Sequence, residues 1–189
     1  MYRTLLRRIS HIRPRGDSLQ PLYFLGKTLT SQTLNVAVIC TGNICRSPMA
    51  EVALRDLISQ DEVLATRVNV TSAGTANWHI GKEMDERARG ALDRAGLSDP
   101  GTLGQFASTE YLDTHDVVLV MTREHVRDIE YRLTNPSTQV VLARNLLDGP
   151  RDMDVADPYY GTDKDFDACL EQLTECVRQL TLVLRQRVA

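Results

Sequence analysis

The apolar positions of this chain form two kinds of pattern, short continuous runs and longer stretches with a helical period. Runs rich in valine, isoleucine and leucine predict four strands, at residues 34–39, 68–71, 117–121 and 139–142. Apolar residues spaced three and four apart predict four helices, at residues 48–60, 84–95, 123–131 and 164–187. The last helix has the clearest pattern, because its apolar residues form one continuous stripe. The stripe consists of Phe166, Cys169, Leu170, Leu173, Cys176, Val177, Leu180 and Leu184.

The order of these elements indicates the fold class. Strands separated by helices are joined by right-handed crossovers, so they form a parallel sheet with helices on both faces. The chain has 189 residues, of which 42% are hydrophobic and 25% charged, as in globular proteins that bury one sizeable core. We therefore expect one α/β domain at residues 34–189 and a separate basic extension at residues 1–33.

The loop after the first strand contains the most informative motif. Cys40 follows the apolar run, Arg46 comes six residues later, and Pro48 suits the first turn of a helix, where its missing N–H group would be unpaired anyway. Gly42 and Asn43 tolerate the left-handed backbone that a tight loop requires. Open α/β sheets bind ligands at the carboxyl ends of their strands, so this loop lies where a site is expected.

Three features of the loop favour an anion next to the Cys40 sulfur: backbone N–H groups, the Arg46 guanidinium and the start of a helix. The same features favour an ionised thiol, which is the nucleophilic form of cysteine. A thiolate beside a bound tetrahedral oxyanion indicates phosphoryl transfer onto sulfur. From the strand pattern alone, the alternative is that Cys40 is a small buried apolar residue.

Residues 40–47, Cys-Thr-Gly-Asn-Ile-Cys-Arg-Ser, fit the pattern Cys-x5-Arg-Ser, and an Asp-Pro-Tyr motif begins at Asp157. The two motifs, in this order, resemble the low molecular weight protein tyrosine phosphatases over residues 34–189. The resemblance implies a doubly wound, four-stranded parallel sheet, and we expect no cofactor. It also implies that Cys40 is the nucleophile, that Arg46 binds the phosphate, and that Asp157 is the general acid and then the base. The rest of the phosphate-binding loop is Thr41, Gly42, Asn43, Ile44, Cys45 and Ser47.

Aromatic residues bear on the choice of substrate. Trp78, Tyr159 and Tyr160 resemble the aromatic wall of the family's substrate cleft, where rings stack on a phenyl ring. Trp78 has an alternative interpretation as a half-buried surface aromatic. Family members that act on phosphoarginine have a smaller threonine at the position of Ile44 and lack the tyrosine pair. The sequence therefore favours a phosphotyrosine-containing protein as the substrate.

The resemblance also assigns supporting roles around the loop. Ser47 is expected to donate to the thiolate, and Ser72 is expected to help hold Asn43. Cys45 is implied to form a reversible disulfide with Cys40, which by hypothesis protects the nucleophile from over-oxidation.

Four positions depart from the family pattern. Thr122 stands where the family usually has an aspartate, and Glu86, between the matching Asp85 and Arg87, stands where the family favours proline. The family's histidine in the middle of the domain falls on Gly101, and a nearby arginine falls on Gly104. These departures put in doubt how rigidly Asn43 is held.

Three alternative functions remain open. A thioredoxin-coupled arsenate reductase shares this fold and loop but needs resolving cysteines in the middle of the domain, and none occurs between Cys45 and Cys169. A phosphoarginine phosphatase is disfavoured by Ile44 and by the tyrosine pair. A phosphate-binding module without turnover is the natural interpretation only where Cys40 or Asp157 is replaced.

The other cysteines and the histidines indicate no further chemistry. Cys169 and Cys176 lie on the apolar stripe of the last helix, which favours a role in core packing. The four histidines form no ligand pattern with the cysteines, so we expect no metal site. Four cysteines without a C-x-x-C pair, no secretory leader and no apolar run of membrane-spanning length favour a cytoplasmic protein.

Charge is divided unevenly along the chain. Residues 1–33 hold six basic side chains and one acidic, a net charge of +5; the whole chain carries −3, so residues 34–189 carry −8. An acidic domain argues against nucleic acid as the main partner. In the basic extension, Leu5, Leu6, Ile9 and Ile12 have near-helical spacing, as in an interfacial helix or a transit peptide. We expect a flexible extension that makes at most a weak contact with a membrane surface or an acidic protein.

Overall fold

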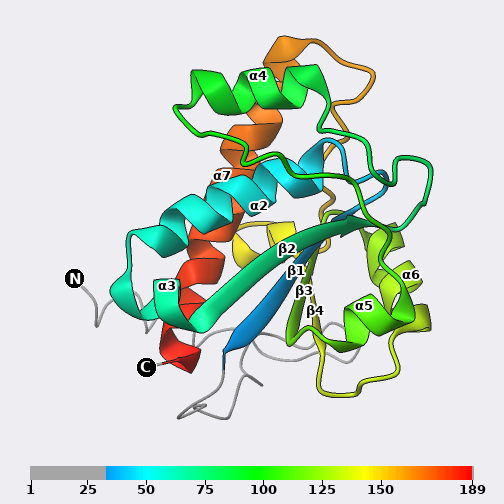
Figure 1. The fold of residues 1–189 in the computed structure, drawn as a ribbon, viewed down its shortest axis with the longest axis vertical. Helices are drawn as coiled ribbons and strands as arrows, with labels where there is room; N and C mark the ends of the chain where they lie inside the picture. The colour runs from blue at the N-terminus through cyan, green and yellow to red at the C-terminus, as the bar shows by residue number, and fades with distance from the viewer. Residues whose placement is uncertain (1–32, 189) are drawn as a thin grey trace.

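The computed structural model describes residues 33–188 of the chain (Figure 1). The expected basic extension lies outside the described residues, apart from Thr33. Four parallel strands form one sheet in the order β2-β1-β3-β4. They are β1 (Leu34–Cys40), β2 (Val68–Gly74), β3 (Val117–Val120) and β4 (Gln139–Leu142). The four predicted strands are confirmed, and β1 and β2 extend beyond their predicted ends to Cys40 and Gly74.

Six α-helices and one 3₁₀ helix are present in the described part of the chain. They are α2 (Arg46–Ser59), α3 (Glu62–Arg67), α4 (Glu86–Arg94), α5 (Thr109–Asp113), α6 (Arg123–Arg132), η2 (Ala143–Leu146) and α7 (Asp163–Arg187). Four of them, α2, α4, α6 and α7, correspond to the predicted helices, and their ends differ from the prediction by at most two residues. The short helices α3 and α5 have no visible helical period. They are started by side-chain caps, from Asp61 and Ser108.

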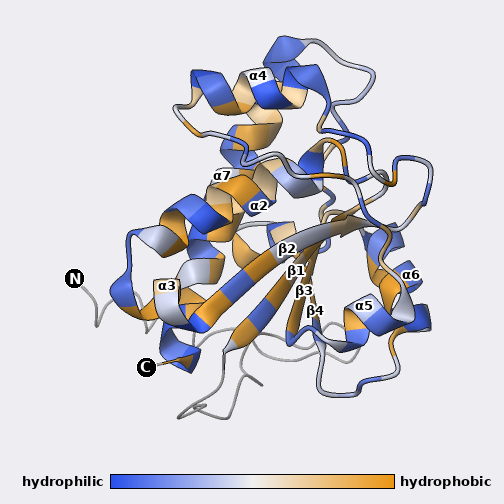
Figure 2. Ribbon diagram, in the orientation of Figure 1, coloured by the Kyte–Doolittle hydropathy of each residue, from blue (hydrophilic) through white to orange (hydrophobic). Residues whose placement is uncertain are grey.

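Alternate residues of β1 face two separate cores, one on each side of the sheet. Val36 and Val38 pack with residues of α2, α4 and α7, whereas Ala37 and Ile39 pack with residues of α5 and α6. Figure 1 shows these two groups of helices on opposite sides of the sheet, and Figure 2 shows that the strands are largely hydrophobic. A strand buried on both faces is apolar throughout, which explains the continuous run in the sequence. The fold is therefore the expected doubly wound α/β sheet.

The long helix α7 completes the larger of the two cores. All eight residues of its predicted apolar stripe are buried. Its first turn is fixed by a capping box between Thr162 and Asp165. Within residues 33–188, no helix is both long and apolar enough to cross a membrane.

The order of the strands places the end of β1 near the middle of the sheet. Val36 of β1 pairs with Val70 of β2 on one side and with Val117 of β3 on the other. The chain goes from β1 to β2 on one side and later adds β3 on the other, so β1 and β3 flank a switch point. The loop between Cys40 and Arg46 therefore lies in the crevice where open α/β sheets bind ligands.

Candidate active site

The loop after β1 turns around the Cys40 sulfur. The backbone N–H of Asn43 donates to Cys40 Sγ over 3.3 Å, and Ser47 Oγ lies 3.0 Å from the same sulfur. Asn43 has the left-handed backbone expected of it, with a φ of 56°. Cys40 is buried, with 2% of its surface exposed. The buried sulfur therefore has polar neighbours supplied by its own loop.

Asn43 is the centre of the network that holds the loop. Its Nδ2 donates to Ser47 Oγ over 2.9 Å and to Ser72 Oγ over 2.8 Å, and its Oδ1 accepts from the Gln105 N–H over 2.9 Å. Because Ser47 accepts from Asn43, its own proton is left for the Cys40 sulfur. The other acceptor within reach of Ser47 is a backbone carbonyl at the longer distance of 3.5 Å. The structure thus brings together the three residues that the sequence assigns to loop support.

The two glycines that depart from the family pattern leave this network complete. Both N–H groups and the oxygen of the Asn43 side-chain amide have hydrogen-bond partners, although Gly101 has no side chain to contribute. Gly104 is required by packing, because a Cβ there would lie 2.3 Å from the His79 carbonyl oxygen. The sequence alone did not identify the backbone N–H of Gln105, the next residue, as the partner of Asn43.

Arg46 connects the loop to a segment far downstream. Its Nη2 forms an ion pair with Oδ2 of Asp157, which is 111 residues away in sequence. The same guanidinium donates to Thr41 Oγ1 and to the Val155 carbonyl, each over 3.3 Å. Arg46 is 4% exposed, whereas the side chain of Asp157 is 45% exposed. The guanidinium is thus fixed inside the site, and the carboxylate lies at its opening to solvent.

The tyrosine pair lies directly beyond Asp157. Asp157 Oδ1 accepts from the Tyr159 N–H over 3.2 Å, and the rings of Tyr159 and Tyr160 meet edge to face with centroids 5.1 Å apart. The Arg87 guanidinium lies over the Tyr159 ring, 5.6 Å from its centroid, and donates to the Gly161 carbonyl over 3.2 Å. Arg87 therefore contacts this segment at the Tyr159 side chain and at the Gly161 backbone.

Arg87 is itself connected to the phosphate-binding loop through Asp85. The Asp85 carboxylate accepts two side-chain hydrogen bonds from Arg87, of 3.0 and 2.9 Å, and these lower the pKa of Asp85. The backbone N–H of Asp85 donates to the Ile44 carbonyl over 2.9 Å. The sequence assigned this pair no role, although both residues match the family pattern. The pair joins the loop to the Asp157 segment.

Trp78 lies on the segment that follows β2. Its neighbour His79 packs against the loop, since a Cβ on Gly42 would lie 2.9 Å from His79 Cδ2. Trp78 is 70% exposed, and Tyr160 is 95% exposed. Within residues 33–188, no ring contact joins Trp78 to the tyrosine pair. The structure therefore places Tyr159 and Tyr160 together, with Trp78 exposed on a separate segment.

The four cysteines differ in their surroundings. All are free thiols and all are buried. Burial and the nearby Asp85 carboxylate raise the pKa of Cys45 far above its usual range. Burial raises the pKa of Cys169 and of Cys176 to about 12. Cys45, Cys169 and Cys176 therefore stay protonated near neutral pH.

Comparison with known proteins identifies the family. Residues 35–189 match the family described as low molecular weight phosphotyrosine protein phosphatase. This chain belongs to that family. It is therefore a phosphatase of the hydrolase class, and its substrates are phosphoproteins.

Individual members of the family align with most of the length of this phosphatase. Low molecular weight protein-tyrosine phosphatase A of Mycobacterium tuberculosis is 40% identical over 139 residues, which are 72% of this chain and 83% of the relative. The crystal structure of YfkJ from Bacillus subtilis is 28% identical, with a TM-score of 0.76 over 84% of this chain and 99% of that one. A structure of the B. subtilis YwlE arginine phosphatase is 26% identical, with a TM-score of 0.73 over 81% and 97% of the two chains.

One buried residue of this phosphatase contacts the phosphate-binding loop although the sequence did not indicate it. His125, on α6, has its Nε2 3.0 Å from Oγ1 of Thr41 in the phosphate-binding loop. Burial and the nearby Arg46 cation together lower the pKa of His125 to about 4. No motif surrounds His125 in the sequence, and α6 reaches the loop only because β3 lies next to β1.

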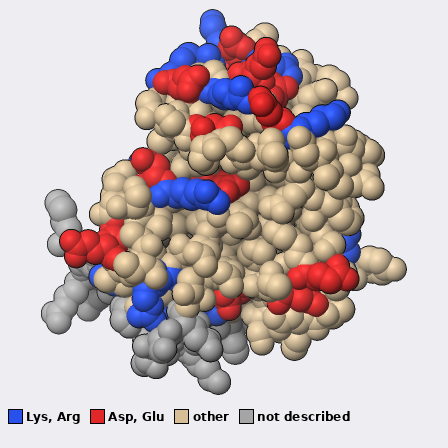
Figure 3. All heavy atoms as spheres, in the orientation of Figure 1, with Lys and Arg blue, Asp and Glu red and all other residues tan. Residues whose placement is uncertain are grey.

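The rest of the described surface offers no comparable chemistry. No group of three or more His, Cys, Asp or Glu side chains within residues 33–188 is placed to hold a metal ion. On the face shown in Figure 3, acidic and basic side chains are interspersed over α4, where Arg89 pairs with Glu83 and Arg94 with Asp167.

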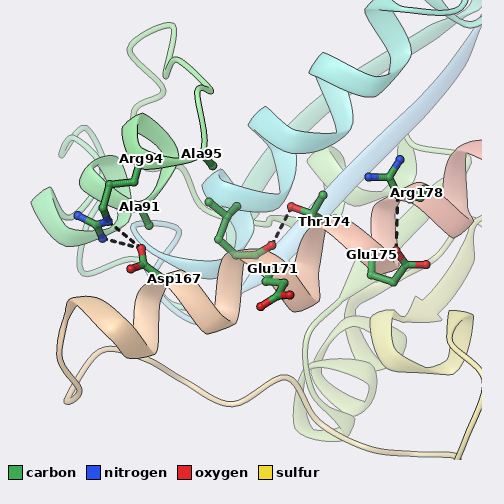
Figure 4. A pocket seen from close by; sticks show the side chains of 9 residues that line it. Ala91, Arg94, Ala95, Asp167, Glu171, Thr174, Glu175 and Arg178 are labelled. Carbon is green, nitrogen blue, oxygen red and sulfur yellow. Dashed lines mark hydrogen bonds and ion pairs between the residues drawn. The ribbon is translucent and has the colours of Figure 1, made fainter.

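A hollow of about 560 Å³ lies between α4 and α7 and shares no residue with the phosphate-binding loop. Figure 4 shows two ion pairs at this hollow, Arg94 with Asp167 and Arg178 with Glu175, and the carboxylate of Glu171 beside them. Ala91, Ala95 and Leu170 line it as well, so the hollow combines apolar side chains with charged ones.

Proposed function

We propose that this phosphatase hydrolyses phosphotyrosine in proteins through a phosphate covalently bound to Cys40, within a catalytic domain of residues 34–189. One contact carries this proposal: Arg46 meets Asp157 beside the loop that surrounds the Cys40 sulfur. Phosphoryl transfer to sulfur needs a nucleophile, a cation for the phosphoryl oxygens and a proton donor for the leaving group. A mutant of the YwlE arginine phosphatase with a phosphorylated active-site serine supports a phosphoenzyme intermediate.

In the first step, the Cys40 thiolate attacks phosphorus, a P–S bond forms and the P–O bond to tyrosine breaks. The Ser47 hydroxyl and the Asn43 N–H stabilise the thiolate before the attack. Asp157, in its protonated form, gives its proton to the leaving tyrosyl oxygen, so that tyrosine departs as the neutral phenol. Its partial exposure to solvent suits a group that must reach the leaving oxygen of a large substrate.

In the second step, a water molecule attacks the phosphorus of the cysteinyl phosphate. The Asp157 carboxylate left by the first step takes a proton from this water. The P–S bond breaks, phosphate leaves, and the Cys40 thiolate and the Asp157 acid are restored. The net reaction consumes phosphotyrosine and water and produces tyrosine and phosphate.

Arg46 supplies the positive charge for both steps. Its Nε is buried and has no hydrogen-bond partner among residues 33–188, so this N–H is available to a phosphoryl oxygen. The helix α2 begins at Arg46, and the first N–H groups of a helix point toward bound anions. The phosphate is thus held by a guanidinium, a helix N-terminus and the loop amides together.

The substrate class follows from the residues around the opening of the site. Tyr159 and Tyr160 offer exposed aromatic surface next to Asp157, on which a phenyl ring can stack. Ile44 is half-buried in the loop, where a bulky side chain narrows the entrance for a flat ring. The similarity to the YwlE arginine phosphatase supports phosphoarginine as a second candidate.

A comparison of three substrates distinguishes these possibilities. We expect kcat/KM for a phosphotyrosine peptide to exceed that for the matched phosphoarginine peptide by about tenfold or more. One good contact between substrate and pocket provides discrimination of this size. Arsenate reduction in the presence of thioredoxin should be absent. In Ile44→Thr the preference for phosphotyrosine should shrink, because the wider entrance no longer selects a flat ring. Equal or greater activity on phosphoarginine in the wild type would reverse the assignment.

We further propose that Cys45 protects Cys40 during oxidation. Hydrogen peroxide converts the Cys40 thiolate to a sulfenic acid, and the Cys45 thiol then condenses with it, releasing water and forming a disulfide. After mild peroxide, peptide mapping should find Cys40 linked to Cys45, and dithiothreitol should restore activity. In Cys45→Ala, Cys40 should instead become sulfinic or sulfonic acid, whereas Cys176→Ala should behave as the wild type. A Cys40 sulfonate beside a free Cys45 in the wild type would contradict the protective role.

A further inference from the structure

The phosphate-binding loop has a buried neighbour that the two steps above do not use. His125 lies in the first turn of α6 with 4% of its surface exposed, and its Nε2 is 3.0 Å from Thr41 Oγ1. The Thr122 side chain caps α6 and accepts from the His125 N–H over 3.2 Å, which fixes the backbone that carries the ring. Arg46 Nη2 donates to the same Thr41 oxygen over 3.3 Å. One hydroxyl therefore joins His125 to the guanidinium of the site.

The surroundings of the ring determine where its proton lies. A guanidinium only donates, so Thr41 Oγ1 is the acceptor toward Arg46. His125 Nδ1 is buried and has no hydrogen-bond partner among residues 33–188. A buried N–H without an acceptor is rarer and more costly than an acceptor without a donor, so the imidazole proton belongs on Nε2. Thr41 then accepts from both neighbours, and its own proton remains free to donate.

The charges around His125 favour the neutral ring. The Arg46 cation faces it, and the carboxylates of Asp128, Asp154 and Asp157 are near enough to oppose that effect. Burial and Arg46 dominate and lower the pKa of His125 to about 4. Near neutral pH the ring therefore donates from Nε2 without adding a second cation beside Arg46.

We propose that His125 is a positioning residue, which turns the Thr41 hydroxyl so that its proton points to an oxygen of the bound phosphate. Through the same hydroxyl, His125 also fixes the position of Arg46 Nη2. Thr41 is half-buried in the loop, and its Oγ1 lies within hydrogen-bond distance of the guanidinium that is proposed to bind the phosphate. This inference rests on the proposed function, because it adds one donor to the phosphate site described there.

A double-mutant cycle in the full-length protein tests the link between the two residues. Thr41→Val and His125→Leu remove the hydroxyl and the ring N–H while retaining apolar volume. Each should lower kcat/KM for a phosphotyrosine peptide by about tenfold, the effect of one hydrogen bond to a charged group, and weaken inhibition by inorganic phosphate to a similar extent. Because His125 acts through Thr41, adding His125→Leu to Thr41→Val should cost less than about twofold more.

Two further variants separate positioning from a general effect on folding. His125→Gln retains a side-chain N–H of similar reach and should recover most of the activity and of the phosphate affinity. His115 is the matched control, since it is also buried and its Nε2 is 3.0 Å from a threonine hydroxyl, that of Thr71. It contacts no residue of the phosphate-binding loop, so His115→Leu should leave phosphate inhibition unchanged.

Results that contradict the role of His125 can be told apart from results that contradict the proposed function. Additive losses in the cycle, unchanged phosphate inhibition in His125→Leu, or an equal loss in His115→Leu would overturn the role of His125. If the wild type hydrolyses no phosphoprotein, protection of Cys40 from iodoacetamide by inorganic phosphate still measures binding, and the same cycle is run with that readout. If His125→Leu does not fold, His125→Asn replaces it, because the shorter amide does not reach Thr41.

Discussion

Cys40→Ser should abolish the hydrolysis of phosphotyrosine, with kcat lowered by about 10⁴-fold or more, as when other enzymes lose their nucleophile. A neutral serine hydroxyl is a much weaker nucleophile than a thiolate, so the attacking anion of the proposed first step is lost. Arg46, Ser47 and Asn43 remain in place, and the variant should therefore keep the wild-type affinity for inorganic phosphate. Steady-state kinetics with a phosphotyrosine peptide, together with inhibition by phosphate, measure both effects.

Cys176→Ser is the matched control for this variant. Cys176 is a fully buried thiol on the apolar face of α7, and burial raises its pKa to about 12. We expect this control to keep the wild-type kcat while its thermal stability falls, because a hydroxyl enters an apolar environment. Activity of Cys40→Ser close to that of the wild type would mean that another group attacks phosphorus.

Asp157→Asn should lower kcat for a phosphotyrosine peptide by about 10²–10⁴-fold, the usual contribution of a positioned proton donor. The amide has no acidic proton for the leaving tyrosyl oxygen and accepts none from the attacking water. The effect should appear in kcat and not as a higher KM, because Arg46 no longer binds a carboxylate and its N–H groups remain available to phosphate. Measuring kcat and KM separately tests both expectations.

The leaving group provides a second readout for Asp157. The p-nitrophenolate anion is a better leaving group than the phenolate of tyrosine, so it depends less on a proton donor. Asp157→Asn should therefore slow the first step less with p-nitrophenyl phosphate than with phosphotyrosine. The matched control is Asp154→Asn, since Asp154 also pairs with an arginine, Arg123, at 3.3 Å, and should retain the wild-type kcat. A loss that is the same for both substrates, or equally large in Asp154→Asn, would argue against a proton donor at Asp157.

Each variant of Cys40 and Asp157 tests a residue that a short motif identified. The motif also predicted the left-handed backbone at Asn43, because only a few residue types tolerate that conformation and the loop is too tight to avoid it. The departures at Gly101 and Gly104 suggested that Asn43 is held less rigidly, and this expectation was wrong. Nothing in the sequence indicated which group would donate to the Asn43 side-chain oxygen. A backbone N–H, of Gln105, takes part instead, and backbone groups have no sequence signature.

The sequence by itself determined the features that depend on local pattern. The four strands and four long helices follow from apolar periodicity, and the buried stripe of α7 was readable residue by residue because one face of a helix repeats every three or four positions. The sequence pattern did not predict the short helices α3 and α5, since neither shows a full helical period. Their caps depend on side-chain hydrogen bonds to particular N–H groups.

Only the tertiary structure decided which distant groups meet. Arg46 reaches Asp157 across 111 residues, His125 reaches Thr41 across 84, and Arg87 joins Gly161 across 74. Periodicity cannot reveal these contacts, because they depend on the order β2-β1-β3-β4, which brings the ends of strands distant in sequence to one edge of the sheet. The sequence thus determined the chemical groups of the site, and the packing of the sheet decided which of them act together.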